Sequence, residues 1–265
     1  MKLGVIGCGK MGTALVAGAV RSGTIKAADV AGMDPHREAR ESFTKHTGAE
    51  AHDGIGALEG CDVFLLCTKP QDVAGALKSV MEVSGESVLV ISIAAGVTLT
   101  TLETAAGHAT RVIRAMPNTP ALVGKGAAAY CLGAKATSSD AEIAKKLLGS
   151  VGLAIEVKES LMDAVTGLSG SGPAYVYQVI EALADGGVRV GLARADALQL
   201  AAQTVFGAAA MVLETGDHPA VLKDMVTSPG GTTIAGLAEL EARGLRSALI
   251  EAVAAATRRS RELGG

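Results

Sequence analysis

The stretch Leu3-Gly4-Val5-Ile6-Gly7-Cys8-Gly9-Lys10-Met11-Gly12 decides the fold. Its first four residues form an apolar run that predicts a short buried strand, and residues 13–22 continue with a helical pattern. The glycines have the Gly-x-Gly-x-x-Gly spacing: the first permits a tight turn, the second lets the backbone approach a pyrophosphate, and the third lets the helix pack on the strand. Strand, turn and helix together predict a dinucleotide site. The candidate cofactor residues in this turn are Gly7, Gly9, Lys10, Met11 and Gly12.

The first half of the chain alternates short apolar runs with helical patterns. The expected strands are 3–6, 30–33, 63–67, 88–93 and 111–115, and the expected helices between them are 13–22, 37–47, 71–83 and 100–106. Strands separated by helices of this length imply right-handed crossovers and a parallel sheet. Weaker strand patterns at 126–132 and 153–157, around a helix at 139–150, fit an extension of the same sheet at one edge.

Beyond residue 158 the apolar residues recur only at helical spacing, as in Val176, Val179, Ile180 and Leu183. The predicted fold is therefore α/β: an N-terminal Rossmann-type dinucleotide-binding domain, residues 1–158, followed by an all-helical domain, residues 159–265. Residues 201–213 are apolar all round, and such a helix must be covered on every face. Since a helical domain of this size can hardly do this alone, we predict a homodimer through the helical domain.

The composition excludes several function classes. The 265 residues carry a formal net charge of −3 with both signs scattered, which gives no basic footprint for nucleic acid and no polybasic patch for a membrane. The four cysteines have no Cys-x-x-Cys spacing and no histidine partners at metal-ligand intervals, so no metal site is expected. With no signal peptide and no uninterrupted apolar stretch of about 18 residues, we expect a cytoplasmic protein without a transmembrane helix.

The choice of cofactor depends on the segment after the second expected strand. Asp34 lies where an acidic side chain holds the ribose 2′-hydroxyl, and this favours NADH because a 2′-phosphate would meet a like charge. His36 and Arg37 follow at once and have the charge to neutralise such a phosphate. Asp34 before Pro35 also fits simple turn initiation. Asp34 and Arg37 are therefore candidate cofactor residues, and the choice between NADPH and NADH stays open.

Three further segments follow expected strands, and the first of them lies at the ligand edge of such a sheet. In Thr68-Lys69-Pro70, Lys69 can reach the cofactor phosphates or ribose, although a solvated lysine before a strand-stopping proline fits equally well. The small residues of Ser92-Ile93-Ala94-Ala95-Gly96-Val97 can lie flat under a nicotinamide ring. In Met116-Pro117-Asn118-Thr119-Pro120, Asn118 offers a donor and an acceptor, and the alternative is a rigid connection.

The segment Ser228-Pro229-Gly230-Gly231-Thr232-Thr233 precedes an expected helix at 234–243. Its glycines allow backbone N–H groups to converge, and Thr232 or Thr233 can cap the helix. A helix N-terminus with free N–H groups is an anion site, and it suits a substrate carboxylate because the Gly7–Gly12 turn already accounts for the phosphates. The alternative is an ordinary capped helix start. No general acid stands out in the sequence, which fits hydride transfer to an already protonated imine better than ketone reduction.

Several motifs in one order strongly resemble the pyrroline-5-carboxylate reductase family over essentially the whole chain. These are the Gly7–Gly12 turn, 92–98, Arg-Ala-Met-Pro-Asn-Thr-Pro at 114–120, Ser-Gly-Ser-Gly-Pro-Ala-Tyr at 169–175, and Leu-Lys-Asp-Met-Val-Thr-Ser-Pro-Gly-Gly-Thr-Thr at 222–233. The resemblance implies reduction of 1-pyrroline-5-carboxylate to L-proline by NAD(P)H, the last step of proline biosynthesis. It also implies a small-molecule substrate and two subunits interlocked by the helical domain, often assembled into a ring of dimers.

The resemblance also implies roles for individual residues. Residues along the cofactor would be Thr68, Lys69, Pro70, Ala94, Ala95 and Gly96, with Asn118 near the nicotinamide. The carboxylate cradle would be Ser228, Gly230, Gly231, Thr232 and Thr233, with the Thr233 hydroxyl, the candidate catalytic group, facing the ring nitrogen. The family often has Asn where this chain has Lys10.

Two other functions remain as alternatives. A 3-hydroxyacid dehydrogenase relative has the same two-domain plan but needs a catalytic lysine on a central helix of the second half, where Lys223 stands in a Leu-Lys-Asp setting that fits the reductase better. A non-catalytic dinucleotide-sensing dimer keeps the first turn but gives no role to residues 228–233.

Overall fold

The computed structural model describes residues 1–85, 87–107 and 109–264. The chain divides into two compact units: Met1–Ser171 together with the residues from Ala254 onward, and Gly172–Val253. Helix α11 (Leu245–Gly264) therefore begins in the second unit and ends in the first. The domain boundary expected between residues 158 and 159 stays a prediction, while packing places residues 159–171 and the end of α11 with the first unit.

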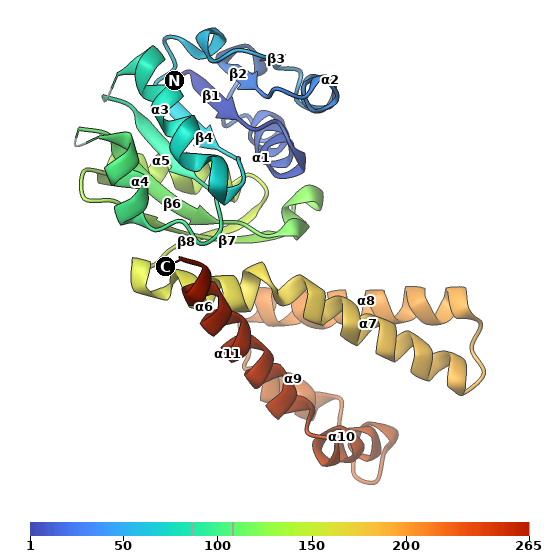
Figure 1. Cartoon of the computed structure of the whole chain (residues 1–265). Coiled ribbons are helices and arrows are strands. Elements are labelled where there is room, and N and C mark those ends of the chain that lie inside the picture. Colours follow the sequence, from blue (N-terminus) through green and yellow to red (C-terminus); the bar gives the residue numbers. More distant parts are fainter. Residues whose placement is uncertain (86, 108, 265) are drawn as a thin grey trace. The chain divides into compact units, whose positions relative to one another are not determined.

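Within the described residues of the first unit, eight strands form one sheet in the order β3-β2-β1-β4-β5-β6-β7-β8 (Figure 1). Its strands are β1 (Leu3–Ile6), β2 (Val30–Met33), β3 (Glu50–His52), β4 (Val63–Leu66), β5 (Leu89–Ser92), β6 (Arg111–Met116), β7 (Gly126–Leu132) and β8 (Gly152–Glu156). Pairing is parallel apart from the antiparallel pair β6–β7. The order of the first six strands is that of the doubly wound dinucleotide fold, so the expected Rossmann-type fold is confirmed, and β7 and β8 extend it at one edge.

The helices of the first unit cover both faces of this sheet (Figure 1). They are α1 (Lys10–Arg21), α2 (Arg37–Thr47), α3 (Val73–Ser84), α4 (Leu99–Ala106), α5 (Ser138–Gly149) and α6 (Met162–Val165). Buried side chains of α1, α2 and α5 share one apolar cluster with the sheet, and those of α3 and α4 share the other. The expected elements are present to within a few residues at their ends.

Strand β3 was not expected from the sequence. It has three residues, Glu50, Ala51 and His52, and its side chains are partly or fully exposed at the sheet's edge. A strand this short and polar has no alternating apolar pattern, so the sequence does not indicate it. Only its hydrogen bonding to β2 defines it.

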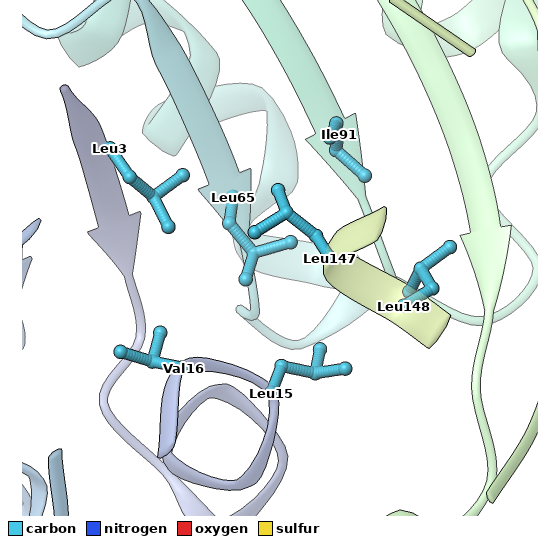
Figure 2. Close-up of a pocket in the computed structure, with 7 residues that line it drawn as sticks. All are labelled: Leu3, Leu15, Val16, Leu65, Ile91, Leu147 and Leu148. Atoms are coloured by element: carbon cyan, nitrogen blue, oxygen red, sulfur yellow. The ribbon is translucent and has the colours of Figure 1, made fainter. Parts of the chain in front are cut away.

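One face of the sheet has a dry aliphatic core. Figure 2 shows seven apolar side chains that meet beneath the sheet from β1, β4, β5, α1 and α5. They are Leu3, Leu15, Val16, Leu65, Ile91, Leu147 and Leu148. The space between them does not admit a water molecule. This packing fixes α1, and with it the glycine turn that precedes α1, against the sheet.

The second unit is helical. Its elements are α7 (Gly172–Arg189), α8 (Arg194–Thr215), α9 (Pro219–Met225), α10 (Thr232–Ala242) and the first part of α11. Helices α7 and α8 pack side by side around Ala184, Ala197 and Ala201 (Figure 1). A Cβ added at Gly187 would lie 3.1 Å from the Cβ of Ala197, so this glycine permits the close approach of the two helices.

Helix α8 leaves most of its apolar side chains uncovered in the single chain. Leu200 is 57% exposed and Leu213 is 79% exposed, although both lie on a helix that is apolar nearly all round. Among the described residues α8 is also the one helix long and apolar enough to cross a membrane by length and composition alone. Residues 201–213 of this helix are those that the sequence indicated as apolar all round, and a second copy was expected to cover them. No transmembrane helix was expected, because Gly207 interrupts the run.

Candidate active site

The predicted site residues of the first unit lie after the carboxyl ends of neighbouring strands. The Gly7–Gly12 turn follows β1, Asp34 follows β2, Thr68 follows β4, Ala94 follows β5, and Asn118 follows β6. In this sheet the strand order reverses direction between β1 and β4. Ligands of open α/β sheets bind in the crevice outside the carboxyl ends of the strands at such a switch point. The fold thus brings these segments to one edge of the sheet, the edge at which the sequence placed Thr68.

The three glycines of the first turn have distinct geometries. Gly7 has φ +96°, and a Cβ added to it would lie 2.7 Å from the Cys67 carbonyl oxygen. A Cβ at Gly12 would lie 2.5 Å from the Gly7 carbonyl oxygen. At Gly9, in contrast, no described atom lies within 4 Å of an added Cβ. Gly7 and Gly12 are therefore required by the fold, whereas Gly9 leaves open space for a ligand to approach the backbone.

The N-terminus of α1 faces this open space without a cap. In the part of the chain that the structure describes, no side chain accepts a hydrogen bond from the first turn of α1, and residues 10–12 include no acidic side chain. The positive end of the helix dipole and the unpaired N–H groups are therefore available to an anion. Lys10, exposed at the first helical position, adds a positive charge near the same end.

Asp34 is buried and already bonded to the backbone. Its Oδ2 accepts a hydrogen bond from the Cys8 N–H at 2.9 Å, and its Oδ1 accepts one from the His36 N–H at 2.9 Å. The side chain thus connects the glycine turn to the turn that starts α2 through these two hydrogen bonds. This is the turn-initiating role that the sequence allowed. Oδ1 also lies 3.1 Å from His36 Nδ1, so Oδ2 is the oxygen that keeps a further lone pair for a ribose hydroxyl.

Of the basic residues after Asp34, His36 and Arg37 are exposed and Arg40 is half-buried. Arg37 is the first residue of α2, and its Nε lies 2.7 Å from Glu41 Oε1 in an exposed i,i+4 pair. Arg40, which the sequence reading did not single out, donates from Nη1 to the carbonyl oxygens of Asp34 at 2.8 Å and Pro35 at 3.0 Å. The only sequence feature that could have indicated Arg40 is its position about one turn after the start of the expected helix at 37–47.

The segment after β4 contains an unpartnered polar atom. The Thr68 hydroxyl oxygen is buried and has no hydrogen-bond partner among the described residues. Lys69 and Pro70 are exposed, and Pro70 begins a short 3-10 turn (Pro70–Asp72) before α3. A buried hydroxyl without a partner is costly, so Thr68 is poised to bond a group that the chain itself does not supply.

The loop after β5 borders a cavity of about 250 Å³. Ala94 is buried and its N–H donates to the Ser92 hydroxyl at 3.3 Å, whereas Ala95 is exposed and Gly96 has φ +76°. The cavity lies between this loop, the starts of α3 and α4, and the end of α11, and Ala95 and Gly96 line it with Pro70 and Leu263. The end of α11 therefore packs against the loop that was expected to lie under the nicotinamide.

Asn118 is buried, and both ends of its amide bond within the chain. Its Nδ2 donates to the Ser169 carbonyl at 3.0 Å, and its Oδ1 accepts from the Ala127 N–H at 2.8 Å. Sequence reasoning did not anticipate this link between the 114–120 and 169–175 motifs.

In the second unit the predicted carboxylate cradle is a turn followed by a helix start. The Gly231 N–H donates to the Ser228 carbonyl at 3.1 Å, Gly230 has φ +66°, and Gly231 precedes the first residue of α10. Thr232 and Thr233 lie inside the helix and do not cap it, so the expectation that one of them would be the cap was wrong. Among the described residues no side chain caps α10, and its first turn has no acidic residue. Its N–H groups are thus available to an anion.

The buried thiols are not nucleophiles. Burial, helped by the nearby Asp34 carboxylate, raises the pKa of Cys8 to about 12. Burial likewise raises the pKa of Cys67 well above its ordinary value. These side chains stay protonated near neutral pH, and only the thiolate attacks. Across residues 1–85, 87–107 and 109–264, no group of three or more His, Cys, Asp or Glu side chains could hold a metal ion.

Comparison with known proteins accounts for both halves of the chain. The family described as "Pyrroline-5-carboxylate reductase dimerisation" matches residues 159–263, and the family described as "NADP oxidoreductase coenzyme F420-dependent" matches residues 2–96. The pyrroline-5-carboxylate reductase of Methanosarcina acetivorans is 47% identical over 99% of this chain and 98% of its own. That of Pisum sativum is 47% identical over 98% of this chain and 95% of its own.

Solved structures agree with the sequence matches. The pyrroline-5-carboxylate reductase of Coxiella burnetii superposes with a TM-score of 0.94 at 33% identity, over 100% of this chain and 98% of its own. The Plasmodium falciparum pyrroline carboxylate reductase, solved with NADP bound, has a TM-score of 0.88 at 34% identity over the same shares. A (S)-3-hydroxybutyryl-CoA dehydrogenase from Ralstonia eutropha shares only the fold, at 14% identity. The chain belongs to the pyrroline-5-carboxylate reductase family.

Proposed function

We propose that this protein reduces 1-pyrroline-5-carboxylate to L-proline with NADPH or NADH, the last step of proline biosynthesis. The observation that carries the proposal is the full-length match to pyrroline-5-carboxylate reductases at 47% identity. The site geometry is compatible with it: an uncapped helix end follows the glycine turn, and a second uncapped helix end follows the 228–231 turn.

The residues present fit a dinucleotide. The open space over Gly9, the unpartnered Thr68 hydroxyl and the uncapped N-terminus of α1 all lie at the switch point of the sheet. In the proposal the backbone from Gly7 to Gly12 holds the pyrophosphate, with Lys10 and Met11 at its side, and Asp34 accepts from a ribose hydroxyl. Arg37 would pair with a 2′-phosphate if the cofactor carries one. The remaining residues along the cofactor are Thr68, Lys69, Pro70, Ala94, Ala95 and Gly96.

The N-terminus of α10 is the proposed substrate site. Backbone N–H groups at Gly230, Gly231 and Thr232 and the Ser228 hydroxyl hold the carboxylate, and the Thr233 hydroxyl contacts the ring nitrogen. When bound, the reduced nicotinamide supplies a hydride to the imine carbon while the C=N electron pair moves to the nitrogen, which gives the secondary amine. The protein's task is to align the two molecules and exclude water, because a protonated imine needs no strong acid.

The helical half carries the proposed assembly. It matches a dimerisation family, and its exposed apolar side chains on α8 need a second copy to cover them. We infer a homodimer, assembled further into a ring of dimers, that acts in the cytoplasm and binds neither nucleic acid nor a membrane. Light scattering at micromolar concentration tests the oligomeric state, and a monomer would contradict the proposed homodimer.

Oxidation of NAD(P)H at 340 nm with pyrroline-5-carboxylate tests the activity, with both cofactors run in parallel. We expect turnover with pyrroline-5-carboxylate and none with a 3-hydroxy acid and NAD(P)+. The reverse result favours the dehydrogenase alternative, and no turnover with either substrate favours a dinucleotide sensor. The ratio of kcat/KM for the two cofactors decides the preference that Asp34 and Arg37 leave open.

Removal of one hydroxyl tests the substrate site. Thr233→Ala should raise the KM for the imine and lower kcat, by about tenfold to a hundredfold in kcat/KM, because it removes a hydrogen bond to the reacting ring. The Kd for NAD(P)H, measured by fluorescence, should not change. Unchanged kinetics would remove Thr233 from the site.

A further inference from the structure

The helix that carries the chain out of the first unit is irregular at one point. Helix α6 continues into a π-helical segment, Thr166–Gly170, and α7 starts only after Ser171. The Ser171 N–H donates to the Thr166 carbonyl, five residues back, at 2.8 Å. Such segments insert a residue into the helix and recur at functional sites. The two compact units also divide between Ser171 and Gly172.

Pro173 explains the irregularity. In a regular helix the N–H of residue 173 would donate to the carbonyl of Ser169, but a proline has no N–H and its ring clashes with that carbonyl. The Ser169 carbonyl thus lacks its ordinary donor from one turn ahead. The missing hydrogen bond therefore follows directly from the sequence Ser169-Gly170-Ser171-Gly172-Pro173.

Asn118 supplies the missing donor. Its Nδ2 lies 3.0 Å from the Ser169 carbonyl oxygen, while its Oδ1 is held by the Ala127 N–H at 2.8 Å. The residue is 8% exposed, so these bonds form away from bulk water. It is also the only asparagine in the 265-residue sequence. The end of β6 and the strand β7 therefore hold the π-helical segment through one amide.

Two other contacts hold the same region tightly. A Cβ added at Gly170 would lie 2.8 Å from Met116 Cε, so the segment lies against the end of β6. One turn earlier, Asp163 Oδ1 accepts a hydrogen bond from the Ser260 hydroxyl at 2.7 Å, which ties the end of α11 to α6. The π-helical segment that leads into α7 and the end of α11 are thus both held by residues of the first unit.

We propose that Asn118 is a positioning residue, which satisfies the Ser169 carbonyl that Pro173 leaves without a helical donor and so fixes the start of α7. The inference rests on the proposed function: the cofactor site is in the first unit and the Ser228–Thr233 cradle is in the second. A loosened start of α7 should then lower turnover, while the cofactor site, which lies within the first unit, stays intact.

Asn118→Asp tests this with little change in shape. The aspartate keeps an oxygen for the Ala127 N–H but presents an acceptor, in place of a donor, to the Ser169 carbonyl. We expect kcat to fall about tenfold to a hundredfold, because misplacement of reacting groups has effects of that size. The Kd for NAD(P)H should stay within about twofold of the wild type. A weakened Kd with kcat unchanged at saturating cofactor would make Asn118 a cofactor ligand and overturn the proposal.

A double-mutant cycle with Pro173→Ala further separates a positioning role of Asn118 from a role as a cofactor ligand. The alanine restores a backbone N–H that can donate to the Ser169 carbonyl. Asn118→Asp should therefore cost several-fold less kcat in the Pro173→Ala background than in the wild type. An equal cost in both backgrounds overturns the proposal. Wild-type turnover in the same assay reports on the proposed function separately.

The single asparagine also permits a direct measurement that needs no variant. Selective ¹⁵N-asparagine labelling gives one side-chain NH₂ pair, from Asn118 alone. We expect one of its protons to exchange slowly with solvent before cofactor is added, and to stay protected after NAD(P)H binds. Fast exchange in the cofactor-free protein, with protection only on cofactor binding, overturns the proposal even if the aspartate variant does not fold.

Discussion

The two halves of this chain treat their apolar side chains differently. In the first unit, the strands β1, β4 and β5 are buried along their whole length between helices. In the second unit the buried apolar side chains are alanines, Ala184, Ala197 and Ala201, while leucines on the same helices stay exposed. The first unit completes its core within one chain, whereas the second is finished only by another copy. We therefore predict that cofactor binding and assembly are separable, so that variants affect one without the other.

The largest effect is expected where the second unit meets its copy. Leu200→Glu places a charge on an exposed apolar position of α8 that the dimer would bury, and burial of an unpaired charge is strongly unfavourable. We expect the dimer to dissociate and the activity to fall at least about a hundredfold, because the helical half then loses the stabilisation that association supplies. Light scattering and the 340 nm assay measure both effects.

Gln199→Glu is the matched control, since it adds the same charge one residue away on an exposed position that is already polar. It should remain dimeric and active. If Leu200→Glu and Gln199→Glu were both dimeric, the interface would lie on another face of the helical half.

The next effect separates fold from cofactor binding within the glycine turn. Gly9→Ala adds a methyl group to open space at a φ of −69°, which any residue adopts, so the thermal midpoint should hardly change. The Kd for NAD(P)H should rise at least about tenfold, because the methyl occupies the space through which the pyrophosphate reaches the backbone. Gly12→Ala, whose Cβ would lie 2.5 Å from the Gly7 carbonyl oxygen, should lower stability by about 1–3 kcal/mol. Equal losses of stability in the two variants would contradict the assignment of Gly9 to cofactor binding and of Gly12 to the fold.

Much of the first unit could be predicted from its sequence because its elements are locally encoded. The Gly7–Gly12 turn depends on residues adjacent in the chain, and the strands are contiguous apolar runs. Asp34 was expected at the end of the second strand and directly follows β2, but its bond to the Cys8 N–H depends on β1 and β2 lying side by side. No local pattern contains that information.

The second half was predictable only as helix. Its apolar pattern indicated a partner because the faces of α8 could not all be covered, but spacing does not say which faces meet. The break before α7 is the exception. Pro173 stands four residues after Ser169, and a proline in a helical pattern predicts a break. The donor that relieves it, Asn118, lies 51 residues earlier and is visible only in the fold.

A smaller effect is expected at the N-terminus of α5, in the first unit. Asp140 is fully buried, accepts hydrogen bonds from the Thr137 N–H and hydroxyl, and pairs with Arg111 Nη1 at 2.5 Å. Asp140→Ala removes this capping box and leaves Arg111 without its partner, so the free energy of unfolding should fall by about 2 kcal/mol. Denaturant titration measures it. The dimer should persist, since α5 belongs to the first unit, and dissociation would show that the two halves are not separable.

The smallest effect appears only at high pH and is confined to the first unit, which contains all four cysteines. The folded pKa of Cys8, about 12, lies above its value of 9.0 in a model compound, so the unfolded chain releases this proton first. The contribution of the protonated thiol is complete below pH 9 and is lost as the pH rises from 9 towards 12. At about pH 10 the wild type should have lost about 1 kcal/mol through this group, and almost nothing near neutral pH. Cys8→Ser cannot release that proton, so its free energy of unfolding should fall less steeply between about pH 8 and about pH 10. Parallel slopes for the two proteins would mean that the thiol is not as buried as the 1% exposure of Cys8 implies.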